Sequence, residues 1–201
     1  MNVNVFFRCF SLLGGLLILS GCVAGQNIRL AYEPMAQPSS PLNIVVAVEV
    51  NDKRPFITSG DKAHSYIGHY RAGLGNTWDV TTQNKEPLAT LIRKDLEADL
   101  HSLGFTLGDA EMVEKRVRVE IADWNFDTYI NGKFWYDCRV WVLDRSGRTL
   151  AEHQLKETVV IKGSFWVGAK YAFEREMPNI YRVIIGKMVR DTPAAVTALK
   201  R

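Results

Sequence analysis

The side chains best suited to chemistry are scattered along this chain of 201 residues, and few have the spacing that a reaction requires. His64 and His69 are five residues apart, whereas a two-histidine metal site on a helix needs a spacing of four. The glycine-rich stretch 68–75 lacks the Lys-Ser/Thr ending of a phosphate-binding loop. No serine lies in the glycine-flanked turn of a hydrolase nucleophile. We therefore expect no catalytic residue, no cofactor and no metal, and predict that the protein is not an enzyme.

Cys22 is the one reactive residue whose neighbours give it a clear meaning. It ends the sequence Leu-Ser-Gly-Cys at 19–22, directly after the apolar run 9–19. That run is too short to span a bilayer and has the length of a signal-peptide core. Leu-Ser-Gly-Cys resembles the lipobox of bacterial lipoproteins. The alternative is an ordinary secretory signal in which the cysteine occurs by chance.

The lipobox resemblance implies a modification and a location. It implies that residues 1–21 are a signal peptide that is removed and that Cys22 then carries a diacylglyceryl group and an acylated amine. Two or three acyl chains hold a protein firmly on a membrane. Residue 23 is Val, whereas Asp at this place favours inner-membrane retention in lipoproteins of enteric type. The resemblance therefore implies a lipid-anchored outer-membrane protein that faces the periplasm.

Composition limits the remaining function classes. Hydrophobic residues make up 47% and charged residues 23% of the chain, which is ordinary for a globular protein. Basic and acidic residues number 25 and 22, so a nucleic-acid partner is not expected. Once Cys9 is removed and Cys22 is lipidated, Cys138 has no partner for a disulfide. We interpret Cys138 as a small buried hydrophobic residue.

The pattern of the mature chain predicts a linker followed by one domain. Residues 22–43 contain three prolines and are expected to form the lipidated N-terminus and linker, with a short edge strand at 28–32 as an alternative for part of it. Residues 44–201 are expected to form a single α+β periplasmic domain. Its first strand, 44–50, is apolar on both faces and should be central in the sheet. Residues 56–84 are predicted to be irregular, apart from a short strand at 77–81.

The second half of the chain predicts a helix, a strand meander and another helix. An apolar stripe at helical spacing favours a helix over 85–103. Alternating residues favour three strands at 116–129, 134–143 and 149–161, with a hairpin at Asn131-Gly132. A last helix is predicted over 178–190. We expect an antiparallel or mixed sheet of four to five strands with two helices on one face.

The order of these elements resembles the YajG-type family of bacterial lipoproteins. The residues that carry the resemblance are Cys22, the strand 44–50 with the following Asp52-Lys53-Arg54, Ile67-Gly68, Leu103-Gly104-Phe105 and Met188-Val189-Arg190-Asp191. The chain departs from the family in its long 68–84 segment and its tryptophan-rich hairpin. The resemblance implies an outer-membrane lipoprotein without an established reaction.

Aromatic residues gather in the hairpin and mark a candidate binding surface. Trp135 and Trp141 share a strand face with Arg139, and such a mixture of aromatic and charged groups is typical of recognition surfaces. The alternative is that segment 56–84 covers this face. Asp52 and Arg54, at a strand end, are further candidates for the surface; their alternative role is to hold the turn.

These observations predict a binding or scaffolding protein. We expect a membrane-tethered, non-enzymatic lipoprotein whose partner is another envelope protein, because tethering raises its concentration near such partners. The alternative is an accessory lipoprotein of an envelope transport system that binds a lipid or a glycan.

Overall fold

Three long strands, formed by segments in which buried and exposed residues alternate, lie at the centre of the fold. The computed structural model describes residues 26–34, 40–71, 76–109, 113–128, 131–162 and 168–201. The strands are β1 (Gln26–Ile28), β2 (Val45–Asp52), β3 (Tyr66–Arg71), β4 (Thr77–Thr82), β5 (Thr106–Leu107), β6 (Lys115–Thr128), β7 (Gly132–Asp144) and β8 (Thr149–Ile161). The helices are α2 (Pro55–Thr58), α3 (Leu88–Ser102), α4 (Gly168–Met188) and α5 (Pro193–Lys200), with a 3₁₀ turn at Gln83–Lys85.

One mixed sheet of eight strands is built around β6. Strands β6, β7 and β8 form an antiparallel meander. The other edge of β6 is shared, because β2 pairs with its first half in parallel and β3 pairs with its last residues in parallel. Strands β4 and β1 continue the sheet beyond β3, and the short β5 pairs with β2. Strand β2 is therefore central over its first residues, as its two apolar faces indicate.

Alternation along β6 and β7 separates a buried face from a face that is open to solvent. The inward residues Val117, Val119 and Ile121 of β6 are all 0% exposed. A register shift between Ile121 and Asp123 keeps the next aromatic residues, Trp124 and Phe126, on the same inward face. We call this face, which packs against the helices, the inner face, and the opposite one the outer face. The core lies between the inner face and the helices.

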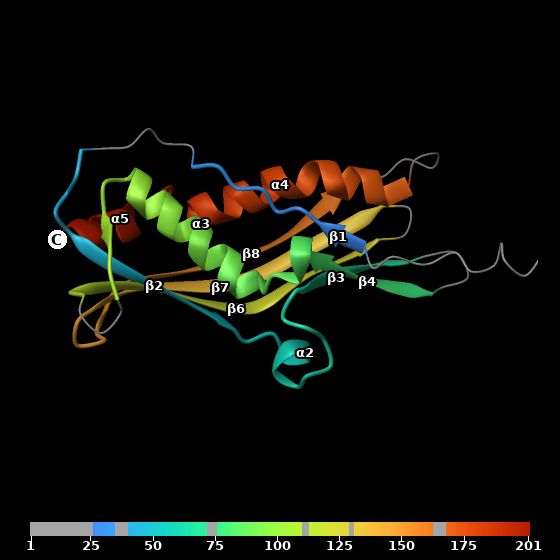
Figure 1. Cartoon of the computed structure of the whole chain (residues 1–201), viewed down its shortest axis with the longest axis horizontal. Helices are drawn as coiled ribbons and strands as arrows, with labels where there is room; N and C mark the ends of the chain where they lie inside the picture. The colour runs from blue at the N-terminus through green and yellow to red at the C-terminus, as the bar shows by residue number, and fades with distance from the viewer. Residues whose placement is uncertain (1–25, 35–39, 72–75, 110–112, 129–130, 163–167) are drawn as a thin grey trace, which may run out of the picture.

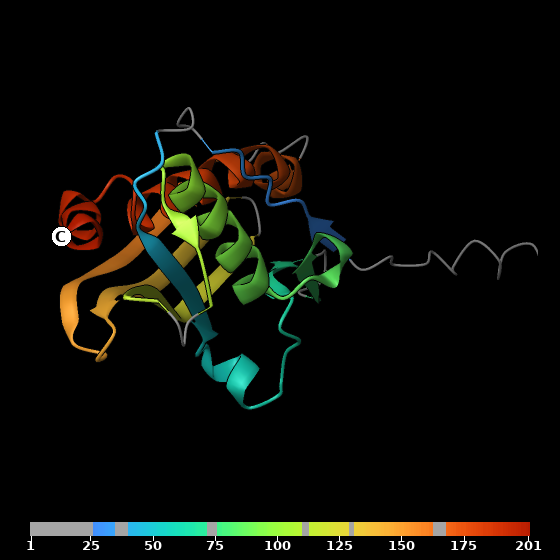
Figure 2. The same cartoon turned by 60° about the vertical axis from the view of Figure 1, so that its left-hand side comes forward.

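The helices cover the inner face of the sheet. Helix α3 buries Leu88, Ile92, Leu96 and Leu100, which recur every four residues and form one stripe. Figure 1 shows α3 and α4 lying over the same side of the sheet, and Figure 2 shows α5 near the start of the meander. Within the residues described, no helix is both long and apolar enough to cross a bilayer.

The predicted α+β class and mixed sheet are confirmed, but four to five strands and two helices were too few. The predicted short strand at 77–81 is confirmed as β4, but the rest of segment 56–84 is not irregular in its described parts, since it forms α2 and β3. Strand β3 has only six residues, most of them buried, and this is too short to give a clear alternating pattern. The last helix was predicted over 178–190, but α4 begins ten residues earlier and contains Pro178.

Part of the range 22–43 packs on the domain. Strand β1 pairs with β4, and Ile28 and Leu30 are buried in the core. The Tyr32 hydroxyl donates a 2.5 Å hydrogen bond to Asp99 Oδ1 on α3. Residues 26–34 are thus part of the folded body, and a linker interpretation does not apply to them. Cys22 and the signal-peptide range 1–21 lie outside the described residues.

Candidate functional site

The outer face of β7 brings the predicted aromatic and charged residues to one side of the sheet. Phe134, Tyr136 and Cys138 point inward and are buried. The residues between them therefore point outward, because successive side chains of a strand alternate between its faces. Trp135 and Trp141 are half-buried there, and the Arg139 side chain is 52% exposed.

Trp135 is held in place by a carboxylate of the neighbouring strand. Its indole Nε1 donates a 2.9 Å hydrogen bond to Asp123 Oδ2. The other oxygen, Asp123 Oδ1, accepts a 2.8 Å bond from the backbone N–H of Trp124. The indole N–H is thus satisfied, and what Trp135 offers to solvent is the apolar part of its ring.

Arg139 and Trp141 form a second, separate feature of the outer face. The guanidinium carbon of Arg139 lies 5.7 Å from the centroid of the Trp141 ring, within the range of a cation–π contact. Arg139 Nε also lies 3.7 Å from Glu152 Oε1 on β8. Trp135 and Trp141 are six positions apart along the strand, which is about 20 Å at roughly 3.4 Å per residue. The structure therefore places the two tryptophans on one face without bringing them into contact.

Asp137 lies between these two features and is neutralised by β8. Its Oδ1 accepts a 2.6 Å hydrogen bond from Gln154, and its Oδ2 a 2.9 Å bond from Lys156 Nζ. Burial acts to raise the pKa of Asp137, but the bonds from Gln154 and Lys156 outweigh it and hold that pKa below its usual value. The same pair raises the pKa of Lys156. The middle of the outer face thus holds an ion pair between Asp137 of β7 and Lys156 of β8.

Segment 56–84 does not cover this surface in its described parts. Strands β3 and β4 extend the sheet sideways from the end of β6, and α2 lies beyond the end of β2 (Figure 1). The alternative of a covered aromatic face therefore fails for the described residues. The physical reason is that this segment satisfies its backbone hydrogen bonds by strand pairing within the sheet rather than by lying over it.

The far end of the outer face holds a polar cluster that no spacing along the chain predicts. Arg71 binds Asp127 through two bonds, Nε to Oδ1 at 2.7 Å and Nη2 to Oδ2 at 2.5 Å. His69 Nε2 lies 3.2 Å from the same Asp127 Oδ1, and its Nδ1 lies 3.2 Å from the Tyr66 hydroxyl. The Arg71 hydrogen bond is the main reason that the pKa of Asp127 is lowered. The parallel pairing of β3 with β6 brings these residues together, and no local sequence pattern predicts that pairing.

Asp52 and Arg54 are buried and bound to each other. Arg54 is 0% exposed and the Asp52 side chain is 4% exposed. Two bonds join them, Nε to Oδ1 at 2.8 Å and Nη2 to Oδ2 at 2.7 Å. Arg54 Nη1 donates to the carbonyl oxygen of Tyr66 at 2.6 Å and to that of Trp124 at 3.3 Å. These two residues hold the end of β2 against β3 and β6, so they are not part of an accessible surface.

The described residues contain no other arrangement suited to chemistry. Cys138 is buried, and burial raises the pKa of its thiol far above the ordinary value, so it is unreactive. No group of three or more His, Cys, Asp or Glu side chains in the described ranges could hold a metal ion.

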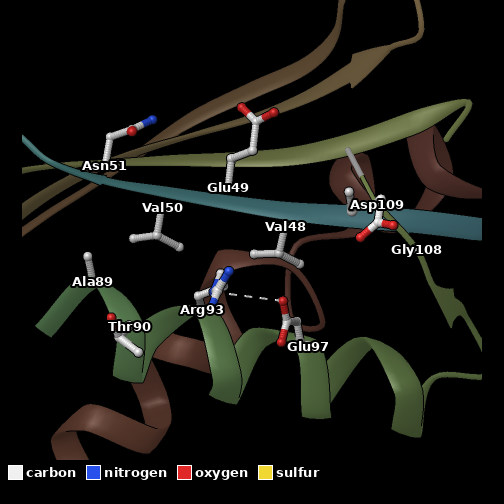
Figure 3. A pocket seen from close by; sticks show the side chains of 11 residues that line it. Val48, Glu49, Val50, Asn51, Ala89, Thr90, Arg93, Glu97, Gly108 and Asp109 are labelled. Atoms are coloured by element: carbon white, nitrogen blue, oxygen red, sulfur yellow. Dashed lines mark ion pairs between the residues drawn. The ribbon is translucent and has the colours of Figure 1, made fainter. Parts of the chain in front are cut away.

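A groove of about 590 Å³ lies between β2 and α3. Val48 and Val50 point from the strand toward the helix, and Arg93 and Glu97 face each other along the helix as a 4.0 Å pair (Figure 3). Glu49 and Asn51 point away from it on the other side of the strand (Figure 3). The groove therefore lies along the edge of β2, with α3 on its other side.

Comparison with known proteins agrees with the fold. No family model matches the chain, and no curated protein matches it. Protein XCC0632 from Xanthomonas campestris, described under the family model DUF330, matches with a TM-score of 0.53 and 9% identity, over 80% of this chain and 93% of that one. This likeness supports the fold alone.

Two further solved structures match at lower TM-scores. The PelC dodecamer from Paraburkholderia phytofirmans has a TM-score of 0.39 and 11% identity, over 83% of this chain and 94% of that one. Lipoprotein GNA1162 from Neisseria meningitidis has a TM-score of 0.30 and 13% identity, over 70% of this chain and 98% of that one.

Proposed function

We propose that this chain is a bacterial envelope lipoprotein, anchored through acyl chains on Cys22, whose domain binds another envelope protein without catalysing a reaction. The observation that carries the binding role is the outer face of β7. It presents Trp135 and Trp141, both half-buried, on a strand that is hydrogen-bonded on both sides. Tryptophan and arginine are the residues that most often dominate binding energy at protein interfaces.

The rigidity of this surface supports the same role. Trp135 is fixed by Asp123, and Arg139 is held beside Trp141 and Glu152. Side chains that are already ordered lose little conformational entropy when a partner binds, so more of the contact energy appears as affinity. The paired charge at Asp137 lets the surface accept a partner without leaving an isolated charge buried.

The location rests on the sequence around residues 19–23. Leu-Ser-Gly-Cys supports lipidation of Cys22, and Val23 supports transfer to the outer membrane with the domain in the periplasm. The order of elements supports a relation to the YajG-type lipoproteins. A tether of this kind raises the effective concentration of the outer face near partners in the same membrane.

The anchor is tested by comparing the native chain with a Cys22→Ala variant. We expect intact mass to show acyl groups on residues 22–201 and the native protein to sediment with outer membranes. The Cys22→Ala variant should lose both the acyl mass and the sedimentation. A native protein that is unmodified and soluble would show that the anchor does not exist.

The binding face is tested with a photoreactive amino acid at Arg139, with Arg93 as the matched control. Both side chains are 52% exposed, but Arg139 lies on the outer face and Arg93 on α3. We expect one protein adduct from position 139, lost when Trp141→Ala is added, and none from position 93. Equal adducts from both positions would contradict the proposal. An adduct with the mass of a lipid or glycan would favour the transport-accessory alternative.

A further inference from the structure

The free edge of β8 is an unusual feature of this sheet. Strand β8 has thirteen residues and pairs only with β7 among the described strands. Long exposed edges are normally blocked by prolines, bulges or charged side chains that project from the edge, because they otherwise pair with another chain. Strand β8 contains no proline, and its pairing with β7 is continuous from Ala151 to Ile161, with one register shift at its start, between Thr149 and Ala151.

The charged side chains of β8 do not protect this edge, because they bind inward. Lys156 binds Asp137 on β7 at 2.9 Å, and Glu152 lies 3.7 Å from Arg139 on the same strand. On the inner face, Glu157 accepts a 3.0 Å bond from the Tyr136 hydroxyl and lies 3.7 Å from Lys187 of α4. Each charge is thus directed back onto its own molecule and leaves the backbone edge accessible.

Apolar side chains are exposed at both ends of the same strand. Val160 is 59% exposed on the outer face, and Leu150 is 38% exposed at the register shift between Thr149 and Ala151, where it borders α5. They are ten residues apart, or roughly 34 Å at about 3.4 Å per residue, so they cannot contact each other within one molecule. A partner that covers both ends must therefore extend along the whole strand.

We propose that β8 pairs with β8 of a second copy of this chain, antiparallel and centred on Leu155. This is the register in which all thirteen residues pair, since Leu155 is the middle of Thr149–Ile161. In this register, Leu150 of each copy lies opposite Val160 of the other copy. Both exposed apolar residues of each copy are therefore covered. Two identical patches related by a two-fold axis form a closed interface.

Charge complementarity supports this register. His153 lies opposite the second copy's Glu157, Gln154 lies opposite Lys156, and no like charges are directly opposed. A shift that centres the pairing on Lys156 would place two lysines opposite each other, which is unfavourable. A shift that centres it on Gln154 would move Val160 past the end of the partner strand. The dimer joins two outer faces into one continuous surface, and it does not depend on lipidation.

The interface is tested with paired charges at the two exposed apolar positions of the full chain, purified from membranes in density-matched detergent. In the Leu150→Lys/Val160→Lys variant, two lysines face each other at both ends of the interface. We expect the dimer dissociation constant to rise about tenfold or more. Leu150→Lys/Val160→Glu puts lysine opposite glutamate and should restore the dimer. Because the two sites are far apart in one molecule, such rescue can only act between copies.

Sedimentation equilibrium gives the oligomeric state, and circular dichroism confirms that each variant is folded. A monomeric native protein at about 100 µM, or two double variants that dissociate equally, would overturn the proposal. Cysteines provide a second test if a lysine variant does not fold. A disulfide between a Glu152→Cys chain and a differently tagged Thr158→Cys chain supports the register, whereas self-linking of Gln154→Cys overturns it.

Discussion

At the scale of single residues, the most constrained group is the guanidinium of Arg54. It is 0% exposed, and its nitrogens bind Asp52 and the carbonyl oxygens of Tyr66 and Trp124. An arginine removed from water is tolerated only when its charge is paired and its donors are used. Arg54 therefore joins three strands, because Asp52 is in β2, Tyr66 in β3 and Trp124 in β6.

Removal of this guanidinium should destabilise the protein strongly. Arg54→Met leaves the Asp52 carboxylate buried without its cation, and we expect a loss of about 3–5 kcal/mol in the free energy of unfolding. Arg118→Met is the control, since Arg118 is 38% exposed and pairs with Glu49; it should cost less than about 1 kcal/mol. Urea unfolding measures both. A stable Arg54→Met protein would mean that the pair is not structural.

At the scale of elements, the hairpin of β6 and β7 depends on a close approach between a strand and a helix. A Cβ atom added to Gly132 would lie 1.9 Å from Phe173 Cε2 on α4, and Phe173 is fully buried. Asn131-Gly132 was interpreted from sequence as a turn signal, but Gly132 is the first residue of β7. The missing side chain lets α4 pack directly on the start of the strand.

We expect Gly132→Ala to destabilise the protein by about 1–3 kcal/mol through overpacking. Phe173→Leu alone should also destabilise it, because it leaves a cavity. The double variant should be more stable than the sum of the two losses predicts, since the smaller side chain makes room for the added methyl group. Thermal unfolding of the four proteins gives the coupling energy, and strictly additive losses would contradict the contact.

Long alternating or helical patterns made most elements predictable. Strand β8 matches its predicted bounds, 149–161, and α3 lies within the predicted 85–103. The predicted strand at 77–81 corresponds to β4, but β3 was missed because its residues are held by pairing with distant segments rather than by a long local pattern. The shared outer face of Trp135, Arg139 and Trp141 follows from alternation. The burial of Asp52 and Arg54 does not, since polar residues at a strand end are usually exposed.

At the scale of the whole molecule, a buried carboxylate ties the N-terminal segment to both main helices. Asp99 of α3 is 0% exposed and accepts hydrogen bonds from the Tyr32 hydroxyl and, at 2.9 Å, from Arg190 Nη1 beyond α4. Burial is the main reason that the pKa of Asp99 is raised above its usual value. Three segments that are far apart in the chain therefore meet at one charge above the core.

Tyr32→Phe tests whether residues 26–34 contribute to the stability of the domain. It removes one donor from buried Asp99, and we expect a loss of about 1–3 kcal/mol in the free energy of unfolding. Tyr171→Phe is the matched control, because Tyr171 is 63% exposed, and it should change little. If chemical denaturation finds the two variants equally stable, this segment does not help to hold the fold together.

The parallel pairing of β1 with β4 also decides how the domain responds to mechanical load. Residues Gln26–Ile28 align with Val80–Thr82 at the edge of the sheet. A pull applied at Gln26 along the strand axis loads the hydrogen bonds of this pair together, in shear, rather than opening them one after another. Under the anchoring proposed at Cys22, tension on the tether would reach β1 and the buried Ile28 before it reaches the meander.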